Sequence, residues 1–342
     1  MKIVIIGLGS IGLRHLQNIL LLGYQSVAVV SRSGILPIDF SHLQAFTSLN
    51  NALAAESFDA AIICTPTAFH TASLSALLRA KVPNIYIEKP VSHSLQEMAE
   101  LVELSASYHS NIVVGYDLHF DPGMQKIKQL LDDEVVGKIV SVNAQVGQYL
   151  PDWRPQEDYR TGMSAKVETG GGVMLDLIHE FDYLLWLFGK VKIIACQYTN
   201  TGSLEIETED VSDVLLRFES GATGTIHLDY LQPKLVRNCM ITGSNGTIFW
   251  NLATSSVKWT TTNKKENEFS YQGYERNTRF VEIMKTFLQK KNDPRLTNLK
   301  KGIESLKLVI AAKKSAKHLC FVNPDSMNLN VDRMENILNP QH

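Results

Sequence analysis

Residues 2–12 read KIVIIGLGSIG, and this stretch decides the fold. A short run of β-branched residues predicts a buried strand, and a helical pattern of apolar residues then continues to a plausible C-cap at Gly23. The loop between the strand and the helix matches G-x-G-x-x-G, with Gly7, Leu8, Gly9, Ser10, Ile11 and Gly12 in order.

Each glycine of this loop has a physical task. Gly7 permits a tight turn, Gly9 lets the backbone approach a pyrophosphate, and Gly12 lets the helix close on the strand. The first N–H groups of the helix then point at the anion. The stretch predicts a dinucleotide site, and a glycine-rich turn in another α/β fold is the alternative.

The order of the predicted elements indicates two domains. Strand and helix patterns alternate from residue 1 to about 120, as in a parallel sheet covered on both faces. From about residue 138 strands follow one another, several with the two-residue alternation of a sheet covered on one face. The fold class is therefore α/β, with a Rossmann dinucleotide-binding domain at 1–120 and an α+β domain at 121–342 that has a large, mostly antiparallel open sheet.

Three helices are expected in the second domain, over 171–189, about 275–291 and about 297–316. The uncovered face of the open sheet is expected to roof a site and to pair with another subunit, giving a homodimer or homotetramer. The last ~20 residues carry Pro, Asn and Asp and are left unassigned.

Composition excludes several classes of protein. A chain of 342 residues is long for one core, and 44% hydrophobic with 20% charged residues is typical of a globular protein. A net charge of −2 gives no basic field for nucleic acid or membrane, and no apolar run approaches the ~20 residues of a membrane span. The four cysteines are widely spaced, at Cys64, Cys196, Cys239 and Cys320. Their spacing predicts neither a disulfide framework nor a structural zinc site, and a cytoplasmic location is expected.

The end of the second strand bears on the choice of cofactor. An NAD site would place an acidic residue ~20 residues beyond the glycine loop, on the ribose 2′-hydroxyl. This chain has Ser31 and Arg32 there. An arginine beside hydroxyls suits a 2′-phosphate, so NADP is favoured over NAD, and a surface arginine without a ligand is the alternative.

The next long strand ends in polar residues that are expected to meet the cofactor near its centre: Cys64, Thr65, Pro66 and Thr67. His70 is expected to reach the same crevice, although a histidine with only local bonds fits equally well.

A lysine leaves the following strand within Glu88-Lys89-Pro90. Ligands of a doubly wound sheet lie beyond the carboxyl ends of its strands, so Lys89 is expected near the reactive end of a dinucleotide. An ammonium there can exchange or share the proton of a substrate hydroxyl. Glu88 is expected to bond the cofactor or orient the lysine. A solvated lysine in a strand-end turn is the alternative.

A polar stripe marks the helix expected over 171–189. Asp176, His179 and Tyr183 fall at i, i+3 and i+7 among Leu, Ile, Phe and Trp. A buried stripe needs partners, so a network that serves packing alone is one alternative. A metal site with His119 is the weaker one, because nothing else supplies typical ligand spacing, and no metal is predicted.

The preceding segment, 149–169, is a long loop rich in Trp, Tyr and Arg, as binding loops often are. Trp153 and Tyr159 are candidates to stack on a sugar ring. Cationic side chains are candidates to pair with an acidic substrate group: Arg154, Arg160 and Lys166. A surface arm or a subunit contact explains this loop equally well.

The chain resembles the glucose–fructose oxidoreductase / inositol dehydrogenase / MocA family over nearly its whole length. The resemblance rests on five motifs in order: GLGSIGLRH (7–15), CTPTAFH (64–70), EKPVS (88–92), GYDLHFDP (115–122) and GGGVMLDLIHEFD (170–182). It implies Lys89 as a polarising group, His179 as the proton acceptor or donor, and Asp176 as the group that tunes the pair.

Two departures bear on the substrate contacts. Many members place the histidine four residues after the aspartate, and here the step is three. Asp117-Leu118-His119 replaces a segment that often holds arginine or asparagine, and His119 is a candidate substrate contact.

The predicted function is an NAD(P)-dependent oxidoreductase that moves hydride between nicotinamide C4 and a secondary alcohol or ketone of a sugar, cyclic polyol or sugar derivative. The loop 149–169 resembles members of nucleotide-sugar or surface-glycan pathways. The alternatives are a non-catalytic NADP-binding sensor, and an enzyme whose tightly bound cofactor serves internal redox in epimerisation or elimination.

Overall fold

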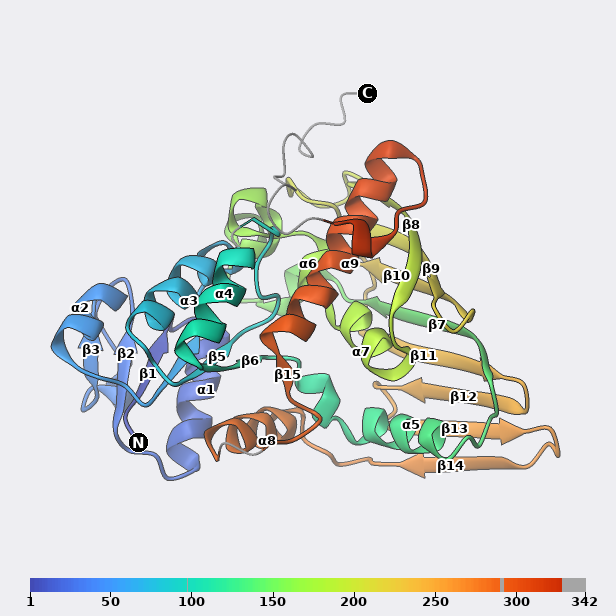
Figure 1. Cartoon of the computed structure of the whole chain (residues 1–342), viewed down its shortest axis with the longest axis horizontal. Helices are drawn as coiled ribbons and strands as arrows, with labels where there is room; N and C mark the ends of the chain where they lie inside the picture. Colours follow the sequence, from blue (N-terminus) through green and yellow to red (C-terminus); the bar gives the residue numbers. More distant parts are fainter. Residues whose placement is uncertain (97, 290–291, 328–342) are drawn as a thin grey trace. The chain divides into compact units, whose positions relative to one another are not determined.

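The computed structural model describes residues 1–96, 98–289 and 292–327, which form two compact units (Figure 1). Unit 1 comprises Met1–Asp117 and Arg276–Ile303, and unit 2 comprises Leu118–Glu275 and residues 304–327. These units differ from the predicted domains of 1–120 and 121–342, because 276–303 groups with unit 1. Residues 328–342, most of the unassigned C-terminal stretch, lie outside the described residues.

Unit 1 is built on a seven-stranded sheet with the order β15-β6-β5-β4-β1-β2-β3. Strands β1 to β6 pair in parallel, and β15 pairs antiparallel with β6 at one edge. The chain order reverses between β1 and β4, where ligands of such sheets bind. The strands are β1 Ile3–Ile6, β2 Val27–Val30, β3 Gln44–Phe46, β4 Ala60–Ile63, β5 Asn84–Ile87, β6 Asn111–Val114 and β15 Thr297–Asn298.

The central strands of this sheet are continuous apolar runs because helices cover both of their faces. Every residue of β1, β2, β4 and β5 is buried. Strands β3 and β15 and helix α2 were not expected from the sequence. The helices of unit 1 are α1 Ser10–Leu21, α2 Leu49–Ala55, α3 His70–Arg79, α4 Met98–Tyr108, α8 Arg276–Leu288 and the start of α9, Leu299–His318.

Helix α8 packs on α1, the helix that follows the glycine loop. The amides of Asn18 and Asn277 exchange hydrogen bonds of 2.8 and 3.3 Å, and the Arg14 guanidinium lies 4.7 Å from the centre of the Phe280 ring. Arg279 forms a buried ion pair with Asp117, directly after the β6 segment. These contacts explain why a segment so late in the chain belongs to unit 1.

Unit 2 is built on an eight-stranded sheet with the order β14-β13-β12-β11-β7-β10-β9-β8. All pairs are antiparallel except β7 with β10, so the predicted fold class is confirmed. The strands are β7 Ile139–Gly147, β8 Val191–Thr199, β9 Val211–Phe218, β10 Thr223–Asp229, β11 Val236–Gly243, β12 Gly246–Asn251, β13 Ser256–Thr261 and β14 Glu266–Ser270.

Helices pack on one face of this sheet. Helix α5 (Pro122–Asp132) contacts β12 and β13, α6 (Val173–Asp176) contacts β9 and β10, and α7 (His179–Phe188) contacts β7. Residues 304–318 of α9 also belong to unit 2. Side chains along β9 alternate between buried and exposed, because successive residues of a strand point to opposite faces. The opposite face carries exposed apolar side chains such as Leu215, which is 53% exposed.

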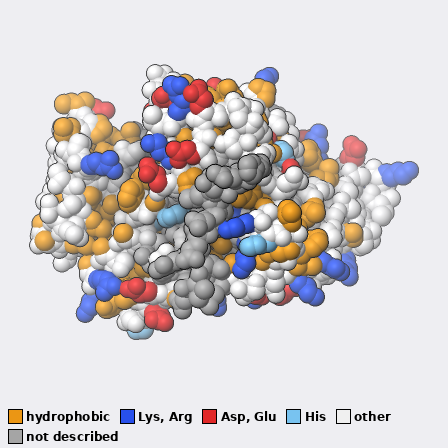
Figure 2. Space-filling view, turned by 90° about the horizontal axis from the view of Figure 1, so that it is seen from above, with side chains coloured by type: hydrophobic (Ala, Val, Ile, Leu, Met, Phe, Trp, Pro, Cys, Tyr) orange, Lys and Arg blue, Asp and Glu red, His pale blue; other side chains and the backbone are white. Residues whose placement is uncertain are grey.

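Two general expectations can be compared with the structure. No helix in the described part of the chain is long and apolar enough to cross a membrane. Acidic and basic side chains are interspersed on the face of the molecule drawn in Figure 2, in keeping with the small net charge.

Candidate functional site

The glycine loop of unit 1 has the close contacts that its motif requires. Gly7 has a φ of +93°, and a Cβ there would lie 2.7 Å from the Cys64 carbonyl oxygen. A Cβ on Gly12 would lie 2.0 Å from the Gly7 carbonyl oxygen. Gly9, the N-cap of α1, faces open space, since a Cβ on it would meet nothing within 4 Å. No side chain caps α1, so its first N–H groups can bind an anion.

Two buried hydroxyls at the same edge of the sheet fit a bound cofactor. Ser31 follows β2 and Thr65 lies just beyond β4. Neither Ser31 Oγ nor Thr65 Oγ1 has a hydrogen-bond partner in the described chain, although both atoms are buried. Buried polar groups are normally satisfied, so both point to a polar ligand. Together with the open space at Gly9, they fit a dinucleotide, and Arg32 lies exposed beside them.

Glu88 occupies a closed network under this edge, and half-buried Lys89 follows it. Glu88 Oε1 lies 2.7 Å from His15 Nε2 and accepts a 3.4 Å bond from the Tyr86 hydroxyl, and Oε2 accepts from the Lys89 main-chain N–H at 3.3 Å. Burial, and then the charge of Glu88, raise the pKa of Tyr86 well above its ordinary value, so the phenol remains a donor. The network fixes Glu88 next to the lysine.

Sequence reasoning missed His15. Its only signal is position: it lies on the apolar face of α1 with Gly12, Leu16 and Ile19, and it is fully buried. A buried histidine needs a polar partner, but the partner, Glu88, is 73 residues away along the chain.

His70, a predicted cofactor contact, lies close to two main-chain carbonyl groups. Its Nδ1 lies 2.8 Å from the Pro90 carbonyl oxygen and its Nε2 lies 2.8 Å from the Thr65 carbonyl oxygen. Burial lowers its pKa, although these two carbonyl groups act in the opposite direction. A neutral imidazole has one N–H and so donates to one of the two carbonyl oxygens, and the predicted cofactor contact of His70 stays a prediction. The Lys89–Pro90 bond is cis.

The predicted helix over 171–189 is divided in unit 2. Helix α6 ends at Asp176 and α7 begins at His179, so the expected single helical face is wrong. Asp176 and His179 are each 7% exposed. Tyr183 does not extend their stripe, because its ring packs edge-on against Trp250 of the sheet, with centroids 6.1 Å apart.

Asp176 is held by a tyrosine that sequence reasoning did not select. The Tyr230 hydroxyl donates to Asp176 Oδ2 at 2.6 Å, and both residues are buried. Tyr230 directly follows β10 and lies 54 residues from Asp176 along the chain. Nothing in the local sequence pattern marks it.

A buried ion pair supports the start of α6. Lys313 Nζ lies 3.0 Å from Glu209 Oε1, with both side chains less than a tenth exposed. Glu209 Oε1 also accepts from the Met174 main-chain N–H at 3.5 Å. Gly172 has a φ of +112°, and a Cβ on it would lie 2.5 Å from Glu209 Oε1. The triple glycine therefore serves close packing against Glu209 and the preceding loop.

His119, a predicted substrate contact, is buried within unit 2. Its Nε2 lies 2.8 Å from Asp182 Oδ2, and its ring stacks on Trp186 with centroids 4.3 Å apart. Ser305 Oγ donates to the other oxygen of Asp182 at 3.2 Å. His119 thus pairs with Asp182, and its predicted substrate contact stays a prediction. No cluster of metal-ligating residues occurs among the described residues.

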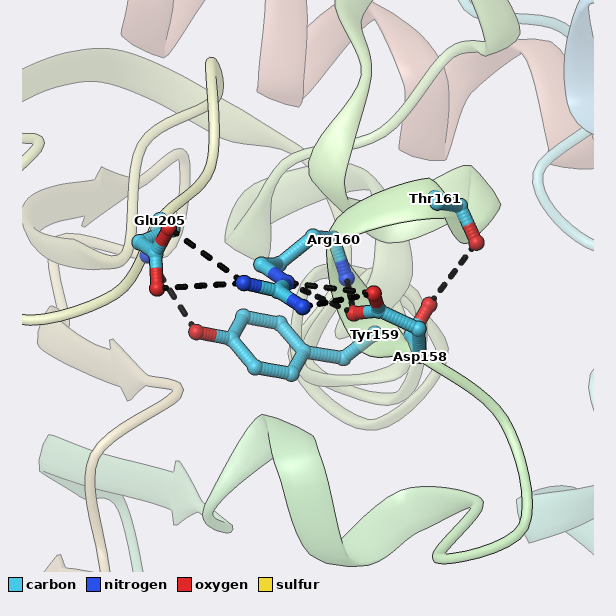
Figure 3. A network of polar contacts seen from close by, with 5 residues as sticks. All are labelled: Asp158, Tyr159, Arg160, Thr161 and Glu205. Carbon is cyan, nitrogen blue, oxygen red and sulfur yellow. Dashed lines mark hydrogen bonds and ion pairs between the residues drawn. The ribbon is translucent and has the colours of Figure 1, made fainter.

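Two candidates of the loop 149–169, Tyr159 and Arg160, bond within unit 2 (Figure 3). The Asp158 carboxylate accepts hydrogen bonds of 2.9 Å from Nε and 2.9 Å from Nη2 of Arg160. Arg160 Nη1 lies 3.5 Å from both carboxylate oxygens of Glu205. Arg160 lowers the pKa of the Asp158 carboxyl. The Tyr159 hydroxyl accepts from the Glu205 N–H at 3.3 Å. Tyr159 and Arg160 therefore fasten the loop to the segment around Glu205.

The other members of this loop are placed differently. Trp153 Nε1 donates to the Gln148 carbonyl at 3.2 Å, and its ring stands edge-on to Tyr230 with centroids 5.4 Å apart. Arg154 is 42% exposed and lies 4.0 Å from Glu157. Trp153 thus packs beside Tyr230, the partner of Asp176.

Comparison with known proteins settles the family. The profile described as "Oxidoreductase family, NAD-binding Rossmann fold" matches residues 1–116, and the GFO/IDH/MocA C-terminal domain matches residues 124–249. The chain belongs to the GFO/IDH/MocA family. Unit 1 accordingly carries the NAD-binding Rossmann fold of this oxidoreductase family.

Named relatives of this GFO/IDH/MocA chain are distant. The uncharacterized oxidoreductase YrbE of Bacillus subtilis is 30% identical over a segment that spans 65% of each chain. The myo-inositol 2-dehydrogenase of Thermotoga maritima is 26% identical over 92% of this chain and 96% of the relative.

Solved structures share the fold over most of the chain. An inositol dehydrogenase homolog from Azotobacter vinelandii, complexed with NAD+, has a TM-score of 0.79 at 16% identity, over 94% of this chain and 97% of its own. The WlbA dehydrogenase of Bordetella pertussis, in complex with NADH and UDP-GlcNAcA, has a TM-score of 0.77 at 20% identity, over 94% and 98%. At these identities the likeness concerns the fold alone.

Proposed function

We propose that this protein is an NAD(P)-dependent oxidoreductase acting on a secondary alcohol or ketone of a sugar, cyclic polyol or sugar derivative. The observation that carries the proposal is the carboxyl edge of the unit 1 sheet. An open glycine loop, two buried hydroxyls that have no partner among the described residues, and Lys89 lie at the carboxyl ends of these strands. The named relatives, among them myo-inositol 2-dehydrogenase, support the substrate class.

Lys89 of unit 1, and Asp176 and His179 of unit 2, are the proposed catalytic residues. A bound nicotinamide dinucleotide would supply the hydride acceptor or donor. His179 would take the hydroxyl proton of the substrate during oxidation or return it during reduction, as a general base and acid. The Lys89 ammonium would stabilise negative charge that develops on a substrate oxygen. Asp176 would orient His179, and Tyr230 and Glu209 fix the segment on which Asp176 lies.

The residue set at the end of β2 favours NADP. Arg32 is exposed, Ser31 Oγ is buried without a described partner, and the segment Ser31-Arg32-Ser33 contains no carboxylate that would repel a 2′-phosphate. A guanidinium can bind phosphate through two parallel hydrogen bonds.

We expect NADP+ to raise the melting temperature more than NAD+ at equal concentration, and Arg32→Asp to reverse this order.

Turnover is then tested with each cofactor on myo-inositol, D-xylose and UDP-GlcNAcA, with reduced nicotinamide absorbance as the readout. A larger shift with NAD+ would show that the preference for NADP is wrong. Tight binding without turnover on a broad sugar and polyol panel would favour a sensor, and a copurified cofactor whose absorbance shows no net change would favour internal redox.

We also propose that the uncovered face of the unit 2 sheet pairs with a second copy. It carries Leu215 (53% exposed) and Phe321 (68% exposed), which line one concavity of about 510 Å³. His227 lies on the same face between Asp213 and Asp229, and bonds to both carboxylates raise its pKa to about 9. A face that carries apolar groups and both charges can meet its own copy across a two-fold axis.

Leu215→Arg is expected to shift the protein from dimer or tetramer to a smaller species in light scattering coupled to gel filtration. Ile38→Arg is the matched control, because Ile38 is an 84% exposed apolar residue of unit 1. An unchanged mass for Leu215→Arg would rule out this face as the contact.

A further inference from the structure

We infer that Tyr230 is the positioning residue that fixes the Asp176 carboxylate for catalysis, an inference that rests on the proposed function. Tyr230 follows the end of β10, and Asp176 ends α6, which packs on β10. The phenol hydroxyl donates to Asp176 Oδ2 at 2.6 Å. Tyr230 is fully buried and Asp176 is 7% exposed, so water does not compete readily for this bond.

Two other segments of unit 2, at Asp210 and at Leu150–Trp153, hold Tyr230 in place. Its main-chain N–H donates to the Asp210 carbonyl at 2.9 Å, and its carbonyl accepts from the Leu150 N–H at 3.0 Å. The Trp153 ring stands edge-on against the phenol ring. The preceding residue, Asp229, accepts main-chain N–H bonds of 2.7 and 2.8 Å through Oδ1 and so fixes the turn that follows. The hydroxyl therefore has a set position before any substrate binds.

Electrostatics fix the direction of the bond. Burial, and then the charge of Asp176, raise the pKa of Tyr230 well above its ordinary value. The phenol therefore stays protonated at neutral pH and donates to Asp176 Oδ2. A hydrogen bond from a neutral donor to a carboxylate is charge-assisted, and here it restrains the position of Asp176 Oδ2.

Loss of the hydroxyl would leave the ring packing intact but remove this constraint. A hydrogen bond to a charged group contributes on the order of 1.5–3 kcal/mol, which corresponds to about 10- to 100-fold in rate if the bond acts through the orientation of Asp176. A role in packing alone would lower stability without a selective effect on turnover.

The test compares Tyr230→Phe with Tyr271→Phe. The Tyr271 hydroxyl also donates to a carboxylate of unit 2, Asp121 at 3.2 Å, and Asp121 caps α5. We expect Tyr230→Phe to lower kcat about 10- to 100-fold with KM and cofactor affinity within about twofold, on whichever of myo-inositol, D-xylose or UDP-GlcNAcA the wild type turns over. Tyr271→Phe should keep kcat while losing comparable thermal stability.

The two proposals can fail separately. Wild-type turnover that Tyr230→Phe leaves unchanged would overturn the positioning role and keep the proposed function. Absence of wild-type turnover would count against the proposed function, and crystal structures of both variants then decide the positioning role. Rotation of the Asp176 carboxylate in Tyr230→Phe alone supports it, and an unmoved Asp176 overturns it.

Discussion

Lys89→Ala is expected to lower turnover by at least about 10²-fold, the usual scale for a lost acid–base or polarising group. Lys89 follows Glu88, which His15 and Tyr86 fix in a buried network at the carboxyl end of β5. In the proposed reaction the ammonium bonds the substrate oxygen as its negative charge develops. An alanine leaves that charge without a partner, so kcat falls, and steady-state kinetics on a substrate from the panel measures the loss.

Dinucleotide binding is expected to survive this change. The pyrophosphate contacts come from the glycine loop and the start of α1, so NADP+ and NAD+ should still raise the melting temperature of Lys89→Ala. Lys285→Ala is the matched control, since Lys285 is an exposed lysine of α8 in the same unit. Near-normal kcat for Lys89→Ala would refute the role of Lys89.

Gly12→Ala and Gly9→Ala are expected to separate folding from cofactor binding. A Cβ on Gly12 would lie 2.0 Å from the Gly7 carbonyl oxygen and 3.3 Å from Cys64 Cβ, so backbone atoms must move. Overpacking of this kind costs about 1–3 kcal/mol or more, and it displaces the loop itself. Gly12→Ala should therefore unfold at lower denaturant concentration and lose dinucleotide binding.

Gly9→Ala is the matched variant with a different outcome. Its φ of −72° is accessible to alanine, and the added methyl group meets nothing within 4 Å. Stability should stay close to wild type, while affinity for NADP+ and NAD+ falls about tenfold or more, or about 1.4 kcal/mol, because the methyl group occupies the approach of the pyrophosphate. Unchanged affinity in calorimetry would place the dinucleotide elsewhere.

The sequence predicted features that depend on short stretches of chain. The strand–glycine–helix pattern of residues 2–12 is local, because the tight turn and the helix–strand contact involve Gly7 and Gly12 themselves. The alternation along β9 follows from the two-residue period of a strand with one buried face. The first unit, its parallel sheet and the mostly antiparallel sheet of unit 2 were accessible in this way.

Local pattern failed where a neighbour distant in sequence decided the outcome. Asp176, His179 and Tyr183 have helical spacing, yet the helix is broken between Asp176 and His179. Tyr183 packs against Trp250 of the sheet instead of extending the polar stripe. His119 and His70 carry the right chemistry for a site, but Asp182 and two main-chain carbonyls engage them. A polar residue in the sequence does not reveal which buried group it will bond to in the folded chain.

The sequence by itself determined the fold class, the glycine loop and the chemical types available to a site, because propensity and periodicity act over a few neighbouring residues. Tertiary structure alone decided that 276–303 joins unit 1, that His15 secures Glu88, and that Tyr230 holds Asp176. Those bonds join residues 73 and 54 positions apart. They form because a buried charge must find a hydrogen-bond partner wherever the folded chain supplies one.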